Sequence, residues 1–256
     1  MSANSLLNRA LLYYSRTSPW ADHPRSLALL DDEERARHER FMFDHSKREF
    51  RAAHAMVRTA LSMHEPVPPE RWRFVKNEFG RPSIDPAICA TDLRFNLSHT
   101  DGMLCLIVAR GREVGADVED AMRDRRTVEV ADRFFAKSEV EALRSLPDAQ
   151  QNQRFFAYWT LKESYIKARG MGLAIPLDGF AFSIEDEEPP RITEVPRVLG
   201  DRVSLRCESV VNDDGARWRF ARARLTERHV AATTVERDRL GWAPVIELRE
   251  LGPESR

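Results

Sequence analysis

The sequence predicts an α+β fold, in which helices and strands occupy separate stretches of the chain. Two observations predict it. A helical pattern over residues 31–63 is followed by short apolar strands that end near residue 119. Helical patterns return over residues 127–169, and strands return after Pro176. This repeated order predicts two similarly built halves that join near residues 111–115.

The chain has 256 residues, which is long enough for one large domain or two small ones with a proper core. We expect residues 1–112 to form the N-terminal half and residues 113–236 to form the C-terminal half. Residues 237–256 form a polar tail to which the pattern assigns no structure. Residues 185–201 are acidic and rich in proline, which is typical of an exposed loop.

The first patterned segments of the N-terminal half are two helices. Residues 31–41 open with acidic side chains, which a helix N-terminus favours. Residues 44–63 then place apolar side chains at helical spacing. Residues 71–79 alternate between apolar and polar, which predicts a strand, and residues 80–84 are typical of a turn.

The most apolar part of this region predicts three short strands. One ends near His99, the next covers residues 103–109, and the third covers residues 113–119. Turn residues separate them at Asp101–Gly102 and at Gly111. Short turns between apolar strands favour an antiparallel meander.

The C-terminal half begins with three helical segments within residues 127–169. Ser138 and Glu141 match a capping box, and Gly170 matches a helix C-cap. The strands predicted after Pro176 are "GFAFSI", "RVSLRCESVV", "WRFARARL" and "HVAATTV".

Composition and charge exclude several classes of protein. Hydrophobic residues make up 42% and charged residues 32%, and the net charge is −1, so no global field attracts nucleic acid or an anionic membrane. The longest apolar run, residues 103–109, is too short to span a bilayer. The three cysteines form no CxxC pair, and the N-terminus lacks a signal-peptide pattern. We therefore expect a cytoplasmic protein that binds neither nucleic acid nor membrane.

Two acids in "GADVED" are the first candidate site. Asp117 and Glu119 are two residues apart on a predicted strand, so both point to the same face. Two carboxylates on one face suit a hard divalent cation, and Mg²⁺ is favoured if phosphates complete the coordination. On this pair alone, an exposed polar strand face is the simpler interpretation.

Polar and basic side chains at two other places form further candidates. Asn96, Ser98 and His99 lie at a predicted strand end, and His99 would donate to an anion if phosphate were near. Ser98 has a hydroxyl, but no G-x-S-x-G elbow surrounds it. Lys76 and Arg81 flank a turn that Pro82 stiffens, and Arg37 lies in the early charged helix; each alone is typical of a solvated base.

The row Phe155, Trp159, Glu163 and Lys167 follows one helix face in steps of four. It starts with aromatic rings, which predict packing into the core, and ends with a carboxylate and an ammonium. The simpler interpretation is a surface ion pair of Glu163 with Lys167. The alternative is a site at the edge of the core, where a third acid and a lysine complete a clamp for metal and phosphate.

Together these residues resemble a known family. "FNLSH", "VGADVE", "FFAKSEVEAL" and "FFAYWTLKESYIKARGMGL", with "FGRP" before them, resemble the 4′-phosphopantetheinyl transferases of the surfactin-synthetase-activating type. The resemblance covers about residues 30–185. Its most specific part is the WxxKExxxK core from Trp159 to Lys167, together with the GxDxE of residues 115–119.

The resemblance implies two pseudo-twofold-related α/β halves with coenzyme A in the cleft between them. It implies transfer of 4′-phosphopantetheine from coenzyme A to a serine of an apo acyl or peptidyl carrier protein, with release of adenosine 3′,5′-bisphosphate. It implies Mg²⁺ held by Asp117, Glu119 and Glu163. The expected contacts to coenzyme A are Arg37, Lys76, Arg81, Pro82, Asn96, Ser98, His99, Lys162 and Lys167.

The residues in catalytic roles follow from this resemblance. Glu163 is expected to accept the proton of the carrier serine, directly or through water. Lys167 and His99 are expected to stabilise the leaving phosphate. One chain supplies both halves, so we expect a monomer. Two rival functions remain, a metal-dependent phosphohydrolase that acts on a nucleotide-type pyrophosphate and a non-catalytic binding module.

The basic segment after the acids is the expected docking site for the carrier protein. Arg123, Arg125 and Arg126 lie there, and Arg133 follows. The resemblance implies that the carrier protein is acidic around the serine that is modified. A solvated basic turn is the alternative.

Three residues depart from the family pattern. Glu34 stands where some relatives have a second base for the 3′-phosphate. Arg81 replaces a commoner lysine, and Ala116 replaces a larger apolar residue. The last two changes keep the charge and the apolar character of their positions.

Overall fold

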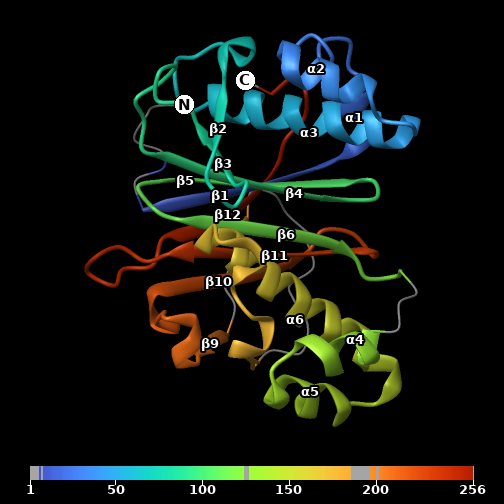
Figure 1. The fold of residues 1–256 in the computed structure, drawn as a ribbon, viewed down its shortest axis with the longest axis vertical. Coiled ribbons are helices and arrows are strands. Elements are labelled where there is room, and N and C mark those ends of the chain that lie inside the picture. Colours follow the sequence, from blue (N-terminus) through green and yellow to red (C-terminus); the bar gives the residue numbers. More distant parts are fainter. Residues whose placement is uncertain (1–5, 7, 124–126, 186–196, 200–201, 256) are drawn as a thin grey trace.

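The computed structural model describes residues 6, 8–123, 127–185, 197–199 and 202–255. Two sheets stack in the middle of the molecule, with helices on the outer side of each (Figure 1). The α+β class predicted from the sequence is confirmed. No helix in the described ranges is long and apolar enough to cross a membrane.

The first sheet contains strands from both ends of the chain. Its order is β4, β5, β1, β12, β8, and α3 packs on its outer face. The bounds are β1 (Arg9–Arg16), β4 (Leu93–Thr100), β5 (Met103–Arg110), β8 (Arg197–Leu199), β12 (Val245–Glu250), α1 (Thr17–Ala21), α2 (Asp32–Glu39) and α3 (Asp44–Ser62). A short hairpin of β2 (Phe74–Lys76) and β3 (Pro82–Ile84) lies beside it. The strand predicted over residues 71–79 is thus much shorter than expected.

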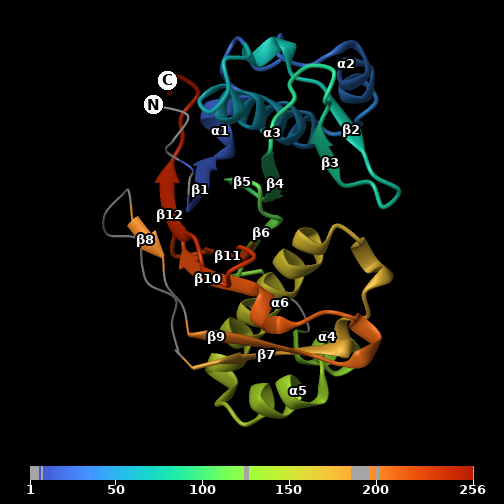
Figure 2. The same ribbon diagram turned by 90° about the vertical axis from the view of Figure 1, so that its left-hand side faces the viewer.

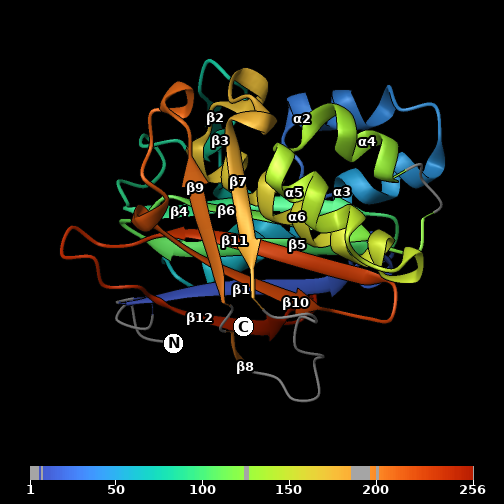
Figure 3. The ribbon, with the colours of Figure 1, turned by 90° about the horizontal axis from the view of Figure 1, so that it is seen from below.

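The second sheet has the order β10, β11, β6, and α6 packs on its outer face. The bounds are β6 (Val114–Asp120), β10 (Trp218–Arg224), β11 (His229–Glu236), α4 (Thr127–Phe134), α5 (Lys137–Arg144) and α6 (Asp148–Arg169). A separate hairpin of β7 (Phe180–Ile184) and β9 (Val203–Cys207) lies below, beside α5 and α6 (Figure 3). The helices predicted within residues 127–169 are confirmed.

The sequence prediction of a three-stranded meander is wrong in its third strand. β4 and β5 pair antiparallel as expected, but β6 pairs with β11 in the other sheet. Both edges of β5 are already taken, by β4 and by β1. Val114, Ala116 and Val118 instead pack face to face against the first sheet, in a core shared by both sheets.

Residues 9–16 and 245–250, which the sequence pattern left without structure, are both strands. β12 runs parallel to β1 and pairs on its other side with β8 (Figure 2). Ile246 and Leu248 are fully buried between the sheets. The segment 237–256, which we described as a polar tail, therefore contains a strand of the first sheet, β12.

The ends of the helices were predicted in part. Gly170 caps α6 with a φ of +66°, as its sequence position indicated. The capping box predicted from Ser138 and Glu141 is wrong, because α5 begins at Lys137 and Ser138 lies inside its first turn. The carboxylate of Glu139 accepts the Ala136 N–H at 3.0 Å instead.

The close approach of α6 to β6 requires glycine at position 115. A Cβ atom on Gly115 would lie 2.0 Å from the Ser164 carbonyl oxygen and 2.5 Å from the Ala168 nitrogen. Both atoms belong to the helix backbone, so no side-chain movement can relieve the clash. Gly115 therefore sets the distance between the helix and the strand that carry the candidate site residues.

We expect Gly115→Ala to destabilise the protein by more than the about 1–3 kcal/mol usual for overpacking, because helix backbone must move. Thermal unfolding measures this directly. Gly252→Ala is the matched control, since a Cβ there would meet only the Ser255 hydroxyl at 3.9 Å. Equal melting temperatures for the two variants would contradict the close approach.

Candidate functional site

The candidate site is centred on Asp117, where β4, β6 and α6 meet. The Ser98 hydroxyl donates to Asp117 Oδ1 at 2.8 Å. The Lys167 ammonium donates to the same oxygen at 2.6 Å and to Ser98 Oγ at 3.0 Å. Three residues that the sequence proposed separately therefore form one hydrogen-bonded cluster.

Side chains of β4 also connect it to β6 across the gap between the two sheets. Asn96 Oδ1 accepts the Ala116 N–H at 2.9 Å, and Ser98 Oγ accepts the Val118 N–H at 3.4 Å. Both side chains are buried. Asn96 and Ser98 thus hold β6 in position, a role that sequence reasoning missed when it expected them to contact a ligand.

Asp117 offers an oxygen that suits a cation. Its side chain is only 6% exposed, and its Oδ2 has no hydrogen-bond partner among the described residues. An unpaired buried carboxylate oxygen is costly unless something cationic binds it. The residues present therefore fit a divalent cation with oxygen ligands. Within the described ranges, however, no group of three His, Cys, Asp or Glu residues is already arranged to hold one.

Glu163 lies one turn before Lys167 on α6 and is half-buried. Burial raises the pKa of its carboxyl group, and the nearby negative charges of Asp117 and Glu119 raise it further, against the opposing effect of Lys167. The carboxyl therefore binds a proton at a higher pH than an ordinary glutamate. That property suits a proton acceptor.

Lys167 keeps its charge in this cluster. Burial alone would lower its pKa, but the Asp117 carboxylate and its hydrogen bond, with the charge of Glu163, raise it above the ordinary value. The side chain is 27% exposed. The ammonium is thus held by Asp117 and Ser98, while part of the side chain remains in solvent.

Glu119 is contacted by Trp159 of α6. The indole N–H donates to Glu119 Oε1 at 3.1 Å. Phe155, one turn earlier, is buried and stacks on Trp159, as the row of residues predicted. The sequence indicated packing for Trp159 and missed its hydrogen bond, because indole packing gives no signal of what the N–H meets.

The expectation that Lys162 contacts coenzyme A is wrong. Its side chain is completely buried, and its ammonium lies 2.7 Å from Glu139 Oε2 and 2.7 Å from each of the carbonyl oxygens of Leu177 and Phe180. These three acceptors use all three N–H groups of the ammonium. Lys162 therefore joins α6 to the segment before β7 and to α5, and has no donor left for a ligand.

Arg81 is also bound within the protein. Its guanidinium donates to Glu113 at 2.7 Å, to the Ala168 carbonyl at 2.8 Å and to the Val114 carbonyl at 3.1 Å. It thereby ties the turn before β3 to the ends of α6 and β6. Arg81 and Pro82 also line a cavity of about 420 Å³, so a ligand can still reach this stretch.

The other expected contacts lie on the surface. Lys76 and His99 are exposed. Arg37 is exposed as well, and its guanidinium lies 5.4 Å from the centre of the Phe50 ring. Arg123 is exposed in the turn after β6, whereas Arg125 and Arg126 lie outside the described residues.

Glu34 is paired with basic side chains of the protein itself. Its carboxylate pairs with Arg58 at 2.7 Å and with His54 at 2.8 Å. Burial alone would raise its pKa, but the His54 hydrogen bond and the charges of His54 and Arg58 lower it to about 2. Glu34 therefore joins α2 to α3 through a charged network.

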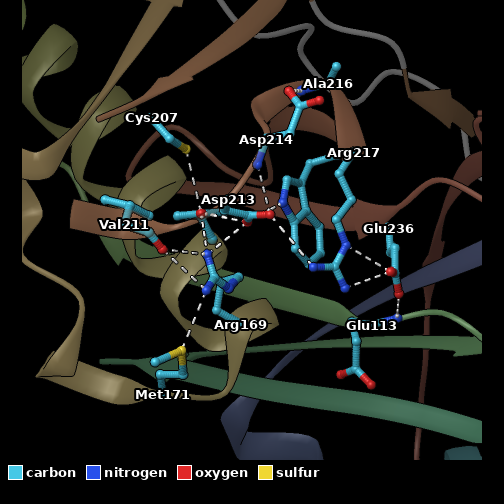
Figure 4. Close-up of polar contacts among 12 residues, drawn as sticks. Glu113, Arg169, Met171, Cys207, Val211, Asp213, Asp214, Ala216, Arg217 and Glu236 are labelled. Carbon is cyan, nitrogen blue, oxygen red and sulfur yellow. Dashed lines mark hydrogen bonds and ion pairs between the residues drawn. The ribbon is translucent and has the colours of Figure 1, made fainter. Parts of the chain in front are cut away.

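The C-terminal end of α6 is also held by a second cluster, which the sequence did not reveal (Figure 4). Asp213 accepts hydrogen bonds from the Tyr165 hydroxyl at 2.7 Å and the Trp218 indole at 2.8 Å, and it pairs with Arg169 at 2.8 Å. Its carboxylate is 4% exposed. The cluster fastens α6 to the start of β10.

Comparison with known proteins gives a consistent result. The family model of the 4′-phosphopantetheinyl transferase superfamily matches residues 113–234. The 4′-phosphopantetheinyl transferase HetI of Nostoc sp. is 35% identical, over 66% of this chain and 71% of its own. A 4′-phosphopantetheinyl transferase of Bacillus subtilis is 30% identical and Sfp of the same species is 27% identical, each over 69% of this chain and 76% of its own.

The matched segment includes Asp117, Glu119, Glu163 and Lys167, which are the acids and the lysine of the candidate site. The chain belongs to the 4′-phosphopantetheinyl transferase superfamily.

Proposed function

We propose that this protein transfers the 4′-phosphopantetheine group of coenzyme A to a serine of an acyl or peptidyl carrier protein. The observation that carries the proposal is the cluster of Asp117, Ser98 and Lys167, beside Glu163, in a chain of this superfamily. The serine oxygen forms a bond to the β-phosphorus of coenzyme A. The pyrophosphate bond breaks, and adenosine 3′,5′-bisphosphate leaves.

Coenzyme A would lie between two related halves, residues 1–112 and 113–236. What supports this is the layering, because α3 covers the outer face of one sheet and α6 the outer face of the other (Figure 1). The sheets face each other, and Asp117 lies where they meet α6. Residues 237–256 would complete the first half through β12.

Mg²⁺ would be held by Asp117, Glu119 and Glu163. The unpaired Asp117 Oδ2 and the raised pKa of Glu163 support this, since both are relieved by a nearby positive charge. When bound, the ion neutralises charge on the pyrophosphate. Lys167 already pairs with Asp117 Oδ1, so the protein itself offsets part of the negative charge.

Each remaining residue has a defined task in this proposal. Glu163 accepts the proton of the carrier serine, and Lys167 donates to the leaving phosphate. His99, at the exposed end of β4, donates to the same group. Arg37, Lys76, Arg81 and Pro82 would contact the nucleotide part.

The partners follow from the reaction. Arg123, Arg125 and Arg126 would dock an acidic carrier protein. The protein would act as a monomer in the cytoplasm, without nucleic acid or membrane, in agreement with its net charge of −1.

Glu163→Gln distinguishes a catalytic base from one half of a surface ion pair. We expect carrier loading, followed by mass spectrometry, to fall by a factor on the order of 10² or more, the usual scale for a general base. The melting temperature of the metal-free protein should stay equal or rise. The folded protein raises the pKa of Glu163, so its charge above that pKa costs stability, and the glutamine removes this cost. Glu141→Gln, on the exposed face of α5, is the control. A fully active Glu163→Gln protein would contradict the role of Glu163.

Removal of divalent cations should stop the transfer. We expect EDTA to abolish carrier loading and Mg²⁺ to restore it, because the cation would neutralise charge on the pyrophosphate and Lys167 offsets only part of the negative charge of the acids. The reaction without carrier is the control for the rival phosphohydrolase. Steady release of adenosine 3′,5′-bisphosphate from coenzyme A alone would favour hydrolysis, and full loading after rigorous metal removal would exclude the proposed cation site.

The docking segment can be tested by charge reversal. Arg125→Glu combined with Arg126→Glu should raise the KM for the carrier, most strongly at low salt, and leave the affinity for coenzyme A unchanged. The control is the same double reversal at Arg71 and Arg239, which are exposed elsewhere on the chain. An unchanged carrier KM in the first variant would show that the carrier docks at another surface.

A further inference from the structure

We propose that Trp159 is a positioning residue, whose indole N–H fixes the carboxylate of Glu119 in the orientation that binds the divalent cation. The inference rests on the proposed function and adds a residue to it. Its central observation is the 3.1 Å hydrogen bond from Trp159 Nε1 to Glu119 Oε1, which connects α6 to the end of β6.

The indole is held rigidly enough to fix another side chain. It stacks on the Phe155 ring, with centres 5.8 Å apart and planes inclined by 20°. The Phe135 ring stacks on the Phe155 ring with centres 5.2 Å apart, and its centre lies 6.3 Å from that of the Trp159 ring. Two rings from α6 and that of Phe135, the residue after α4, therefore form one aromatic stack, and this stack sets the direction of the Trp159 N–H.

The backbone around Glu119 is fixed as well. Its neighbour Asp120 points to the opposite face of β6, where it pairs with Arg228 and accepts the Met122 N–H. Asp117, two residues earlier, is held by Ser98 and Lys167. Glu119 follows on the same strand, and the Trp159 N–H contacts its carboxylate from α6.

Packing alone does not require an N–H at position 159. Phe155 already fills the buried part of the stack, at 2% exposure, whereas Trp159 is half-buried near the acids. A phenylalanine could stack on Phe155 equally well. What tryptophan adds is a donor to an ionised oxygen, and such outer contacts typically change metal affinity by about 10–100-fold.

Trp159→Phe tests the proposal, because it keeps a ring in the stack and removes the donor. The readout is binding of Mn²⁺ in the presence of coenzyme A and without carrier, measured from the electron paramagnetic resonance of free Mn²⁺. We expect the affinity to fall by about 10-fold or more. The Mg²⁺ concentration for half-maximal carrier loading should rise in parallel, with little change in the KM for the carrier.

Two variants control for packing. Phe135→Leu loosens the same stack but keeps the N–H and the Phe155 ring against which the indole lies, so the loss of Mn²⁺ affinity should be clearly smaller than in Trp159→Phe. Trp72→Phe removes a comparable indole hydrogen bond, to Ser62 Oγ at 2.9 Å, in the other part of the molecule. We expect it to lower the melting temperature without changing Mn²⁺ binding.

The outcomes separate this inference from the proposed function. Wild-type Mn²⁺ affinity in Trp159→Phe, or an equal loss in Phe135→Leu, would overturn the positioning role of Trp159. Failure of the wild-type protein to load any carrier would count against the transferase function instead. A loss in Trp159→Phe that is clearly larger than in Phe135→Leu, with a retained melting temperature, would support the inference.

Discussion

The structure depends on the contact between α6 and β6 at Gly115. The backbone of α6 occupies the space that a side chain at position 115 of β6 would need. The consequence is that residues on one face of α6 reach residues on the facing side of β6. Lys167 meets Asp117, and Trp159 meets Glu119, because the helix lies this close. Ser164 adds a buried hydrogen bond to Thr234 at 2.8 Å, which fixes the helix on β11 as well.

The two lysines of α6 show how neighbours in sequence can differ in role. Lys162 and Lys167 are five residues apart and so point to different sides of the helix. Lys162 faces the inner side, where Glu139 and two carbonyl groups enclose its charge. Lys167 faces β4 and β6 and keeps part of its surface in solvent. The sequence pattern alone does not distinguish the buried lysine from the one at the candidate site.

Local features were therefore well predicted from the sequence, and long-range features were not. Helical spacing of apolar residues predicted the helices, and the glycine at position 170 predicted the end of α6, because both features depend on residues that are close in sequence. The same-face argument for Asp117 and Glu119 also follows from strand geometry. The pairing of β6 with β11, the place of β12 and the bonds of Asn96 depend on residues far apart in the chain. A single sequence carries no spacing rule for them.

The position of β12 has a consequence for how the chain folds. In the first sheet Arg9 of β1 pairs with Val245 of β12. β1 therefore cannot complete its pairing until a strand more than two hundred residues later in the sequence has been made. Until β12 arrives, one edge of β1 is unpaired, and such edges are prone to join with other chains. Contacts this distant in sequence also form slowly, since a long loop must close first. During synthesis, the first sheet is thus completed only after all strands of the second sheet have been made.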